Sequence, residues 1–267
     1  GLDVAPLVRR GPRPARDPAR AVTSLLDALE QQLQRELTMT APASTLTTGI
    51  VDLHHSDGRY DLAASKAGGV VAMIHKATEG KDWKDPLFVQ AMEACKVNGV
   101  ARGTYHFASA SSPGAVQADF FLSVVGDRAE LLVLDWETNH GRAGTMLRAE
   151  AVAFVRRIED RTGRKPVVYG YLSMLRNECA KASPDELAAL GACPLWLAAY
   201  GPDPLAVRPP KAWARWDLFQ YTNGSDGPAD REMYPRTVPG FARAAQDRSV
   251  FRGSTDDLMT WWKACGR

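Results

Sequence analysis

The chain has 267 residues, of which 45% are hydrophobic and 24% are charged, and its formal net charge is +2. These proportions are those of an ordinary folded protein, so they exclude a largely disordered or collagen-like chain. Basic and acidic residues are interspersed, which gives no extended cationic face and no electrostatic case for nucleic-acid binding. No apolar run approaches the roughly 20 residues of a membrane-spanning helix, so no membrane span is predicted.

The first part of the chain, residues 1–48, differs from the rest. Residues 1–20 are rich in proline and arginine and predict a linker or tail. From Ser24 onward the leucines recur at helical spacing and predict one amphipathic helix: Leu25, Leu26, Leu29, Leu33 and Leu37. The polar stretch 38–48 predicts a boundary. We therefore expect a tail, helix and linker over 1–48 and a folded domain over 49–267, with the helix docked on that domain or on an upstream domain or partner.

After this boundary, short apolar runs alternate with segments of helical periodicity. Strands are predicted at 49–55, 69–77, 100–108, 129–137, 165–171, 193–201, 214–222 and 241–251. Helices are predicted at 60–68, 85–99, 112–125, 145–163 and 183–191. The alternation indicates parallel βαβ units, and eight strands favour an α/β, TIM-like barrel. Because the helical signal fades after residue 201, we expect five β/α units followed by three strands with minimal helices.

An open doubly wound sheet is the structural alternative to the barrel. Sheets of this kind often bind a nucleotide at a G-x-G-x-x-G motif, but no such motif follows the first predicted strand. The sequence therefore gives no support for a nucleotide cofactor.

Two acids stand at the end of the fourth predicted strand, in the run LLVLDWE. Residues i and i+2 of a strand share a face, so Asp135 and Glu137 should project together while Trp136 points away, under the helices. Asp52 occupies the equivalent end of the first strand, and in a barrel these ends form the rim where active sites lie. Like charges partly shielded from water raise the proton affinity of at least one carboxyl group, which can then act as a general acid. Solvated acids at strand ends are the structural alternative.

A metal site is a further alternative, because hard cations bind carboxylate oxygens such as those of Asp52, Asp135 and Glu137. The adjacent residues His54 and His55 should point to opposite faces of the strand, so they cannot easily bind the same ion. No metal and no cofactor are predicted.

The four cysteines, Cys95, Cys179, Cys193 and Cys265, form no C-x-x-C pair, which disfavours a zinc site. Free buried thiols and a disulfide between Cys179 and Cys193 both remain open.

Nine short motifs occur in order along residues 49–251: GIVD, IHKATEG, GTYHF, LDWE, PVVYG, LWLAAYG, FQYT, VPG and QDRSVF. On these motifs the chain resembles the glycoside hydrolase family 25 lysozymes, which are N-acetylmuramidases. The resemblance implies a (β/α)5(β)3 barrel, with the predicted N-terminal helix as an addition. It also implies hydrolysis of the β-1,4 bond between N-acetylmuramic acid and N-acetylglucosamine in the glycan strands of peptidoglycan.

The resemblance also implies roles for individual residues. Glu137 would be the general acid, and Asp135 would assist as a second carboxylate or by holding the substrate's acetamido group. Asp52 and Asp247 match the family's other two rim acids. The residues expected to line the substrate groove are Tyr105, Phe107, Tyr169, Trp196, Tyr200 and Gln220. Phe107 and Tyr200 fit the filling of the barrel interior equally well.

The chain departs from the family pattern at a few positions. Ser249 stands where the family usually has Asn, which makes the role of Asp247 less secure, and His54 and His55 replace smaller residues after the first acid, which could reshape one subsite. A binding barrel that grasps peptidoglycan without cutting it is the alternative function, although a lapsed site would be expected to have lost an acid. Action in the periplasm or the extracellular cell wall is implied. A secreted effector with a delivery or immunity partner is one possible setting, beside an autolysin or a phage lysin.

Overall fold

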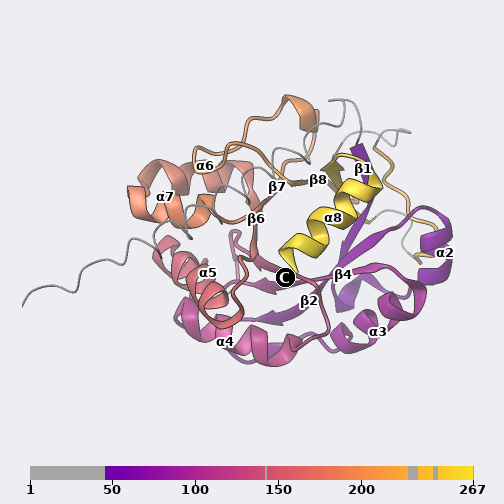
Figure 1. Ribbon diagram of the computed structural model, residues 1–267, viewed down its shortest axis with the longest axis horizontal. Helices are drawn as coiled ribbons and strands as arrows, with labels where there is room; N and C mark the ends of the chain where they lie inside the picture. Colours follow the sequence, from indigo (N-terminus) through magenta and orange to yellow (C-terminus); the bar gives the residue numbers. More distant parts are fainter. Residues whose placement is uncertain (1–45, 142, 228–233, 243–245, 267) are drawn as a thin grey trace, which may run out of the picture. The chain divides into compact units, whose positions relative to one another are not determined.

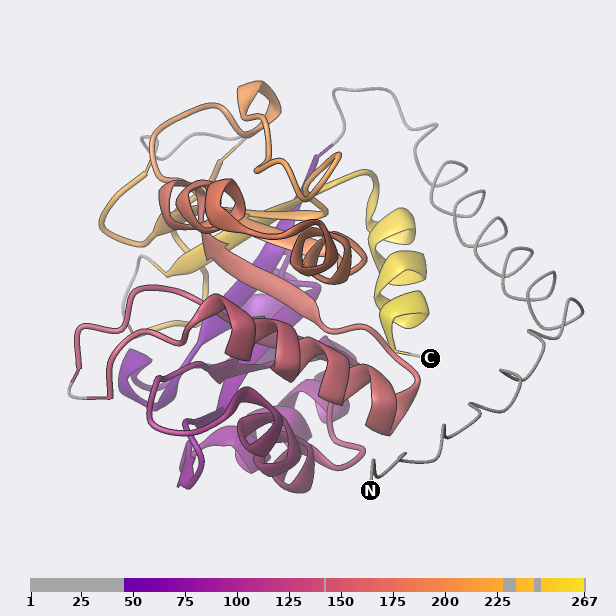
Figure 2. The same ribbon diagram turned by 90° about the vertical axis from the view of Figure 1, so that its left-hand side faces the viewer.

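The computed structural model describes residues 46–141, 143–227, 234–242 and 246–266. These residues form a closed barrel of eight strands with helices around its outside (Figures 1 and 2). The strand order is β1-β9-β8-β7-β6-β5-β4-β2, and pairing of β1 with β2 closes the ring. Pairing is parallel from β1 through β2, β4, β5, β6, β7 and β8, and β9 runs antiparallel between β8 and β1. The predicted α/β barrel is confirmed, while the predicted N-terminal helix lies outside the described residues.

The strands that build the barrel fall close to the predicted runs. They are β1 (Leu46–Leu53), β2 (Ala72–Glu79), β4 (Ala101–Phe107), β5 (Leu131–Asp135), β6 (Val167–Tyr171), β7 (Leu195–Ala198), β8 (Leu218–Asn223) and β9 (Asp247–Arg252). The last strand begins at Asp247 rather than near residue 241, so the predicted start of this strand is wrong. Phe241 instead makes an isolated bridge to Tyr60, and the two rings stack with centroids 5.2 Å apart.

Alternation along each strand divides the apolar side chains into two layers. The inner layer fills the barrel and includes Ile50, Ile74, Val133 and Trp196. The outer layer lies between the strands and the surrounding helices. Trp136 belongs to this outer layer, is 0% exposed and donates its indole N–H to the Met146 carbonyl at 2.9 Å. The prediction that Trp136 packs outward is therefore confirmed.

The helices of the β/α units surround the barrel in Figure 1. They are α2 (Leu62–Ala67), α3 (Phe88–Asn98), α4 (Gly114–Val125), α5 (Arg148–Thr162), α6 (Leu172–Lys181) and α7 (Pro184–Gly191). The helices α3 and α5 end at Gly99 and Gly163 in the left-handed conformation that glycine adopts readily, as the sequence indicated. Helix α6 was not predicted, because its polar residues conceal an apolar face of which only Leu175 and Cys179 are buried.

The expectation of minimal helices after residue 201 holds only between the strands, where the 3-10 turn η2 (Pro204–Ala206) lies. It is wrong for the end of the chain, which forms α8 (Thr255–Cys265). This helix starts at a capping box in which Ser254 and Asp257 satisfy each other's backbone N–H groups. Its Leu258 and Trp262 are buried in the inner apolar layer at the amino ends of the parallel strands. The helix thereby closes one end of the barrel and leaves the other end for the site.

All four cysteines are thiols rather than disulfides, so Cys179 and Cys193 are not joined. None of the helices in the described part of the chain is long and apolar enough to cross a membrane.

Candidate active site

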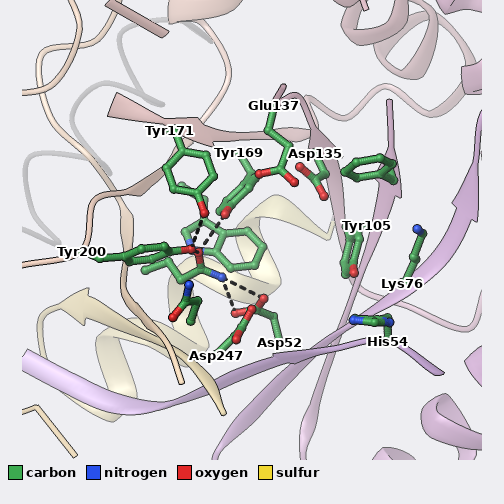
Figure 3. Close-up of a pocket in the computed structure, with 14 residues that line it drawn as sticks. Asp52, His54, Lys76, Tyr105, Asp135, Glu137, Tyr169, Tyr171, Tyr200 and Asp247 are labelled. Atoms are coloured by element: carbon green, nitrogen blue, oxygen red, sulfur yellow. Dashed lines mark hydrogen bonds between the residues drawn. The ribbon is translucent and has the colours of Figure 1, made fainter. Parts of the chain in front are cut away.

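A cavity of about 250 Å³ opens at the carboxyl ends of the parallel strands (Figure 3). All ten residues that the sequence nominated line it: Asp52, Tyr105, Phe107, Asp135, Glu137, Tyr169, Trp196, Tyr200, Gln220 and Asp247. Four further residues complete the lining: His54, Lys76, Tyr171 and Asn223. The strands β1, β2, β4, β5, β6, β7, β8 and β9 or their following loops thus all contribute to one concave site.

Strand β5 delivers the pair of acids to this cavity. Leu131 and Val133 point into the barrel, and Asp135 continues the same face with 8% of its surface exposed. In register with Asp135 lie Phe107 on β4 and Tyr169 on β6, which also line the cavity. Among the described residues, Asp135 Oδ1 is buried without a hydrogen-bond partner. This oxygen is an acceptor that a bound molecule could use.

The other two acids meet across the antiparallel pair of β1 and β9. Asp52 is directly opposite Asp247 in the register, so two carboxylates face each other on neighbouring strands. Burial raises the pKa of Asp52 well above its usual range, and the negative charge of Asp247 raises it further. In Figure 3 these two acids lie on the side of the cavity opposite Asp135 and Glu137.

Gln220 on β8 joins Asp52 to a row of tyrosines. Its Nε2 donates to both oxygens of Asp52, at 2.9 and 3.0 Å, which opposes the rise in the pKa of that carboxyl group. Its Oε1 accepts from the hydroxyls of Tyr169 and Tyr200, each at 2.7 Å, and Tyr171 donates to the Tyr200 hydroxyl at 2.9 Å. Because Oε1 accepts two hydroxyl bonds, the amide can only turn its donor toward Asp52. Gln220 therefore serves as a fixed hub of the cavity wall.

Trp196 lies at the base of the cavity, in the inner apolar layer, and is only 2% exposed. Its ring lies edge-on against Tyr169 with centroids 4.6 Å apart. Its indole N–H donates to Ser249 Oγ at 2.9 Å. Ser249, the residue that departs from the family pattern, thus accepts a hydrogen bond from Trp196. Alternation along β9 still brings Asp247 to the cavity.

Asp135, at the end of β5, and Glu137, just after it, hold their protons more tightly than acids in water. Burial raises the pKa of Glu137 to about 7, while the Lys76 ammonium acts in the opposite direction. Burial also raises the pKa of Asp135 well above its usual range, and the neighbouring Glu137 raises it further. The cavity therefore contains a carboxylic acid that can donate a proton near neutral pH.

Lys76 is the cation at the edge of this acidic cavity. Its Nζ lies 2.7 Å from Glu79 Oε2 and sits over the rings of Phe107 and Trp83, at 4.6 and 4.8 Å from their centroids. The ion pair with Glu79 fixes the ammonium beside the acids, where it favours their ionised forms.

Three of the four lining residues outside the nominated set have a signal in the sequence or a recognisable cause. Lys76 follows Ile74, and Tyr171 follows Tyr169, so simple alternation places both on the inner face. Asn223 breaks the alternation of β8, because a shift in register between Gln220 and Thr222 brings Asn223 opposite Asp247. Only tertiary pairing reveals that shift.

His54 and His55 lie beyond the end of β1, because His54 caps the 3-10 turn η1 (His55–Asp57), so the prediction that both lie on the first strand is wrong. Their side chains nevertheless separate. His54 lines the cavity, whereas His55 turns to Asp85, whose Oδ2 lies 3.0 Å from His55 Nδ1. Within the described residues, no group of three or more His, Cys, Asp or Glu side chains is arranged to hold a metal ion.

The sequence of residues 51–228 matches the profile of the glycosyl hydrolases family 25. The chain belongs to this family. This family 25 chain is 31% identical over 210 residues to Lysozyme M1 of Streptomyces globisporus, which covers 72% of this chain and 69% of that protein. It is 30% identical over 172 residues to the uncharacterized protein YegX of Escherichia coli O6:H1, covering 61% of this chain and 58% of that protein.

Solved structures agree with this family assignment. The crystal structure of a bacterial lysozyme from Streptomyces coelicolor superposes with a TM-score of 0.68 and 26% identity, over 83% of this chain and 99% of that chain. The barrel of this family 25 chain is therefore the fold of a solved lysozyme, and the chain is a glycoside hydrolase.

Proposed function

We propose that this chain is a lysozyme that hydrolyses the β-1,4 bond between N-acetylmuramic acid and N-acetylglucosamine in peptidoglycan. The observation that carries the proposal is the meeting of Glu137, whose pKa burial raises to about 7, with Asp135 in one cavity. The likeness to Lysozyme M1 and to the lysozyme of Streptomyces coelicolor supports the choice of substrate.

In the proposed mechanism Glu137 is the general acid that protonates the leaving glycosidic oxygen. Its raised pKa keeps it protonated up to neutral pH, and breaking the bond then leaves positive charge on the sugar ring. Asp135 assists from the end of β5, two residues before Glu137. Its buried Oδ1, which has no partner among the described residues, is suited to accept the N–H of the substrate's acetamido group. Held in this way, the acetamido oxygen can approach the anomeric carbon, which is a substrate-assisted route.

Asp52 and Asp247 support this chemistry from the opposite side of the cavity. The charge of Asp247 raises the pKa of Asp52, so the two acids do not ionise equally easily, and the one that stays ionised adds negative potential where the sugar becomes positive. Gln220 orients Asp52 through its two hydrogen bonds.

Replacement of the proposed acid tests the mechanism. Glu137→Gln keeps the shape of the side chain and removes its proton, so release of reducing ends from purified peptidoglycan should fall by about 10²–10⁴-fold. Glu159→Gln, an exposed acid on α5, is the matched control and should leave the rate unchanged. Turnover at the wild-type rate in Glu137→Gln would overturn the assignment of the acid.

Mass spectrometry of the digested peptidoglycan tests the bond that is cut. Products that end in reducing N-acetylmuramic acid are expected. Products that end in reducing N-acetylglucosamine would instead identify a glucosaminidase. Tight binding of peptidoglycan by the wild-type chain without any release of reducing ends would favour the non-catalytic binding module.

Such an enzyme acts where peptidoglycan lies, in the periplasm or the extracellular cell wall. The basic, proline-rich residues 1–20 and the leucine-rich segment after them would provide a linker or a contact with an upstream domain or a delivery or immunity partner. The setting of a secreted effector is part of this proposal.

A further inference from the structure

Trp83 is the exposed tryptophan at the rim of the barrel. It lies on the two-residue strand β3 (Trp83–Lys84), which folds back antiparallel to the end of β2. Trp83 is 36% exposed. Five other tryptophans are only 0% to 6% exposed: Trp136, Trp196, Trp213, Trp216 and Trp262. The indole ring of Trp83 thus lies at the surface beside the cavity, where solvent reaches it.

The ring of Trp83 rests on a fixed support. The His55 ring lies 5.3 Å from it, centroid to centroid. Asp85 fixes His55, because its Oδ2 accepts the His55 backbone N–H at 3.0 Å and lies 3.0 Å from the imidazole Nδ1. The carboxylate of Asp85 is itself 0% exposed and also accepts from the Leu87 N–H at 2.9 Å. A ring supported in this way is preorganised for binding, which lowers the entropy cost of capturing a ligand.

Two lines of contact connect Trp83 with the cavity. Lys76 lies between Trp83 and Phe107, and both Lys76 and Phe107 line the cavity. On the other side the rings of His55 and His54 are 5.6 Å apart, and His54 also lines the cavity. The exposed ring is therefore continuous with the wall beside the acids, and Lys76 and His54 mark that side in Figure 3.

We propose that Trp83 forms an additional sugar site, on which an N-acetylhexosamine unit of the glycan strand stacks after the strand leaves the cavity. This inference rests on the proposed function. The apolar face of a pyranose ring packs well on an indole ring, which offers a large rigid surface with a negative face. The two basic side chains in contact with the ring are paired, Lys76 with Glu79 and His55 with Asp85. The exposed lysines Lys81 and Lys84 flank Trp83 in the sequence, so the test also includes strands that keep their acidic stem peptides.

The test compares long and short substrates freed of stem peptides, and it includes long strands that keep their stem peptides as a third substrate. Trp83→Ala should raise KM roughly fivefold for long glycan strands and leave their kcat unchanged. For a short oligosaccharide that fills only the cavity, KM should stay at the wild-type value. Trp83→Phe should keep most of the affinity because it keeps an aromatic face. Val97→Ala, at a residue 82% exposed on α3, is the control for loss of an exposed apolar side chain and should behave as wild type.

The other outcomes would overturn the inference. An unchanged KM for long strands in a folded Trp83→Ala, as judged by its thermal unfolding, would remove the sugar site. A loss confined to strands that keep their stem peptides would assign the surface to the peptide. An equal loss on long and short substrates would place Trp83 in support of the cavity itself. If the wild type releases no reducing ends, the proposed function fails separately, and calorimetric titration of the same variants with peptide-free strands still tests the site.

Discussion

The two ends of the barrel satisfy opposite requirements. At the amino ends of the parallel strands, α8 closes the barrel with Leu258 and Trp262, which are 0% and 1% exposed. At the carboxyl ends a cavity of about 250 Å³ opens instead, and Asp52 and Asp135, which line it, are 9% and 8% exposed. Burial of apolar surface stabilises the closed end, whereas burial of carboxyl groups costs free energy at the open end. We infer that packing of α8 at the closed end stabilises the fold and offsets the free-energy cost of the buried acids at the open end.

Loss of the Trp262 side chain, through which α8 closes the barrel, should give the largest change in stability. Trp262→Ala removes a buried indole next to Gly103, so the free energy of unfolding should fall by about 3–5 kcal/mol. Urea denaturation measures this fall. Trp261→Ala on the same helix, where the side chain is only partly buried, should cost less. The kcat of folded Trp262→Ala at low temperature should stay near wild type. A large fall in kcat without loss of stability would contradict the separation of the two ends.

Removal of Glu137, an acid of the cavity, should raise the free energy of unfolding rather than lower it. Because burial raises the pKa of Glu137 to about 7, the folded state holds this proton more tightly than the unfolded state. Stability from this group is therefore present at acid pH and is lost as the pH rises toward 7. Glu137→Gln does not titrate, so its unfolding free energy should exceed that of wild type by at most about 3 kcal/mol at pH 8. At pH 4 the two should be equal. Urea denaturation at both pH values checks this, and a variant less stable than wild type at pH 8 would refute it.

Loss of the cation beside the mouth should have the smallest effect. Lys76 lowers the pKa of both Glu137 and Asp135, so Lys76→Met should raise both. Glu137 then stays protonated to higher pH, and the alkaline limb of the kcat profile should move upward. Lys81→Met, at an exposed lysine of the β2–β3 turn, should leave the profile unchanged. An alkaline limb that stays in place or moves to lower pH would show that Lys76 does not set the acidity of the cavity.

By itself the sequence determined the barrel and the residues around its mouth. Apolar periodicity marked the strands, and alternation within them placed Asp135 and Glu137 together with Trp136 outward, because the side-chain period of a strand is two. The same alternation extends to Lys76 and Tyr171. The ordered motifs then brought Asp52, Asp247 and the aromatic residues into one site, and all of these line the cavity.

The tertiary structure decided what depends on contacts between distant segments. The shift in register that turns Asn223 toward Asp247 arises from the pairing of β8 with β9. Helix α8 can close one end of the barrel only because the pairing of β1 with β2 closes the ring of strands. The helix is short, so its sequence alone does not show which surface its apolar face contacts. The pKa of Glu137 and the fixed amide of Gln220 likewise depend on burial and on partners from other strands. Sequence specified which side chains face inward, and packing specified how strongly they hold their protons.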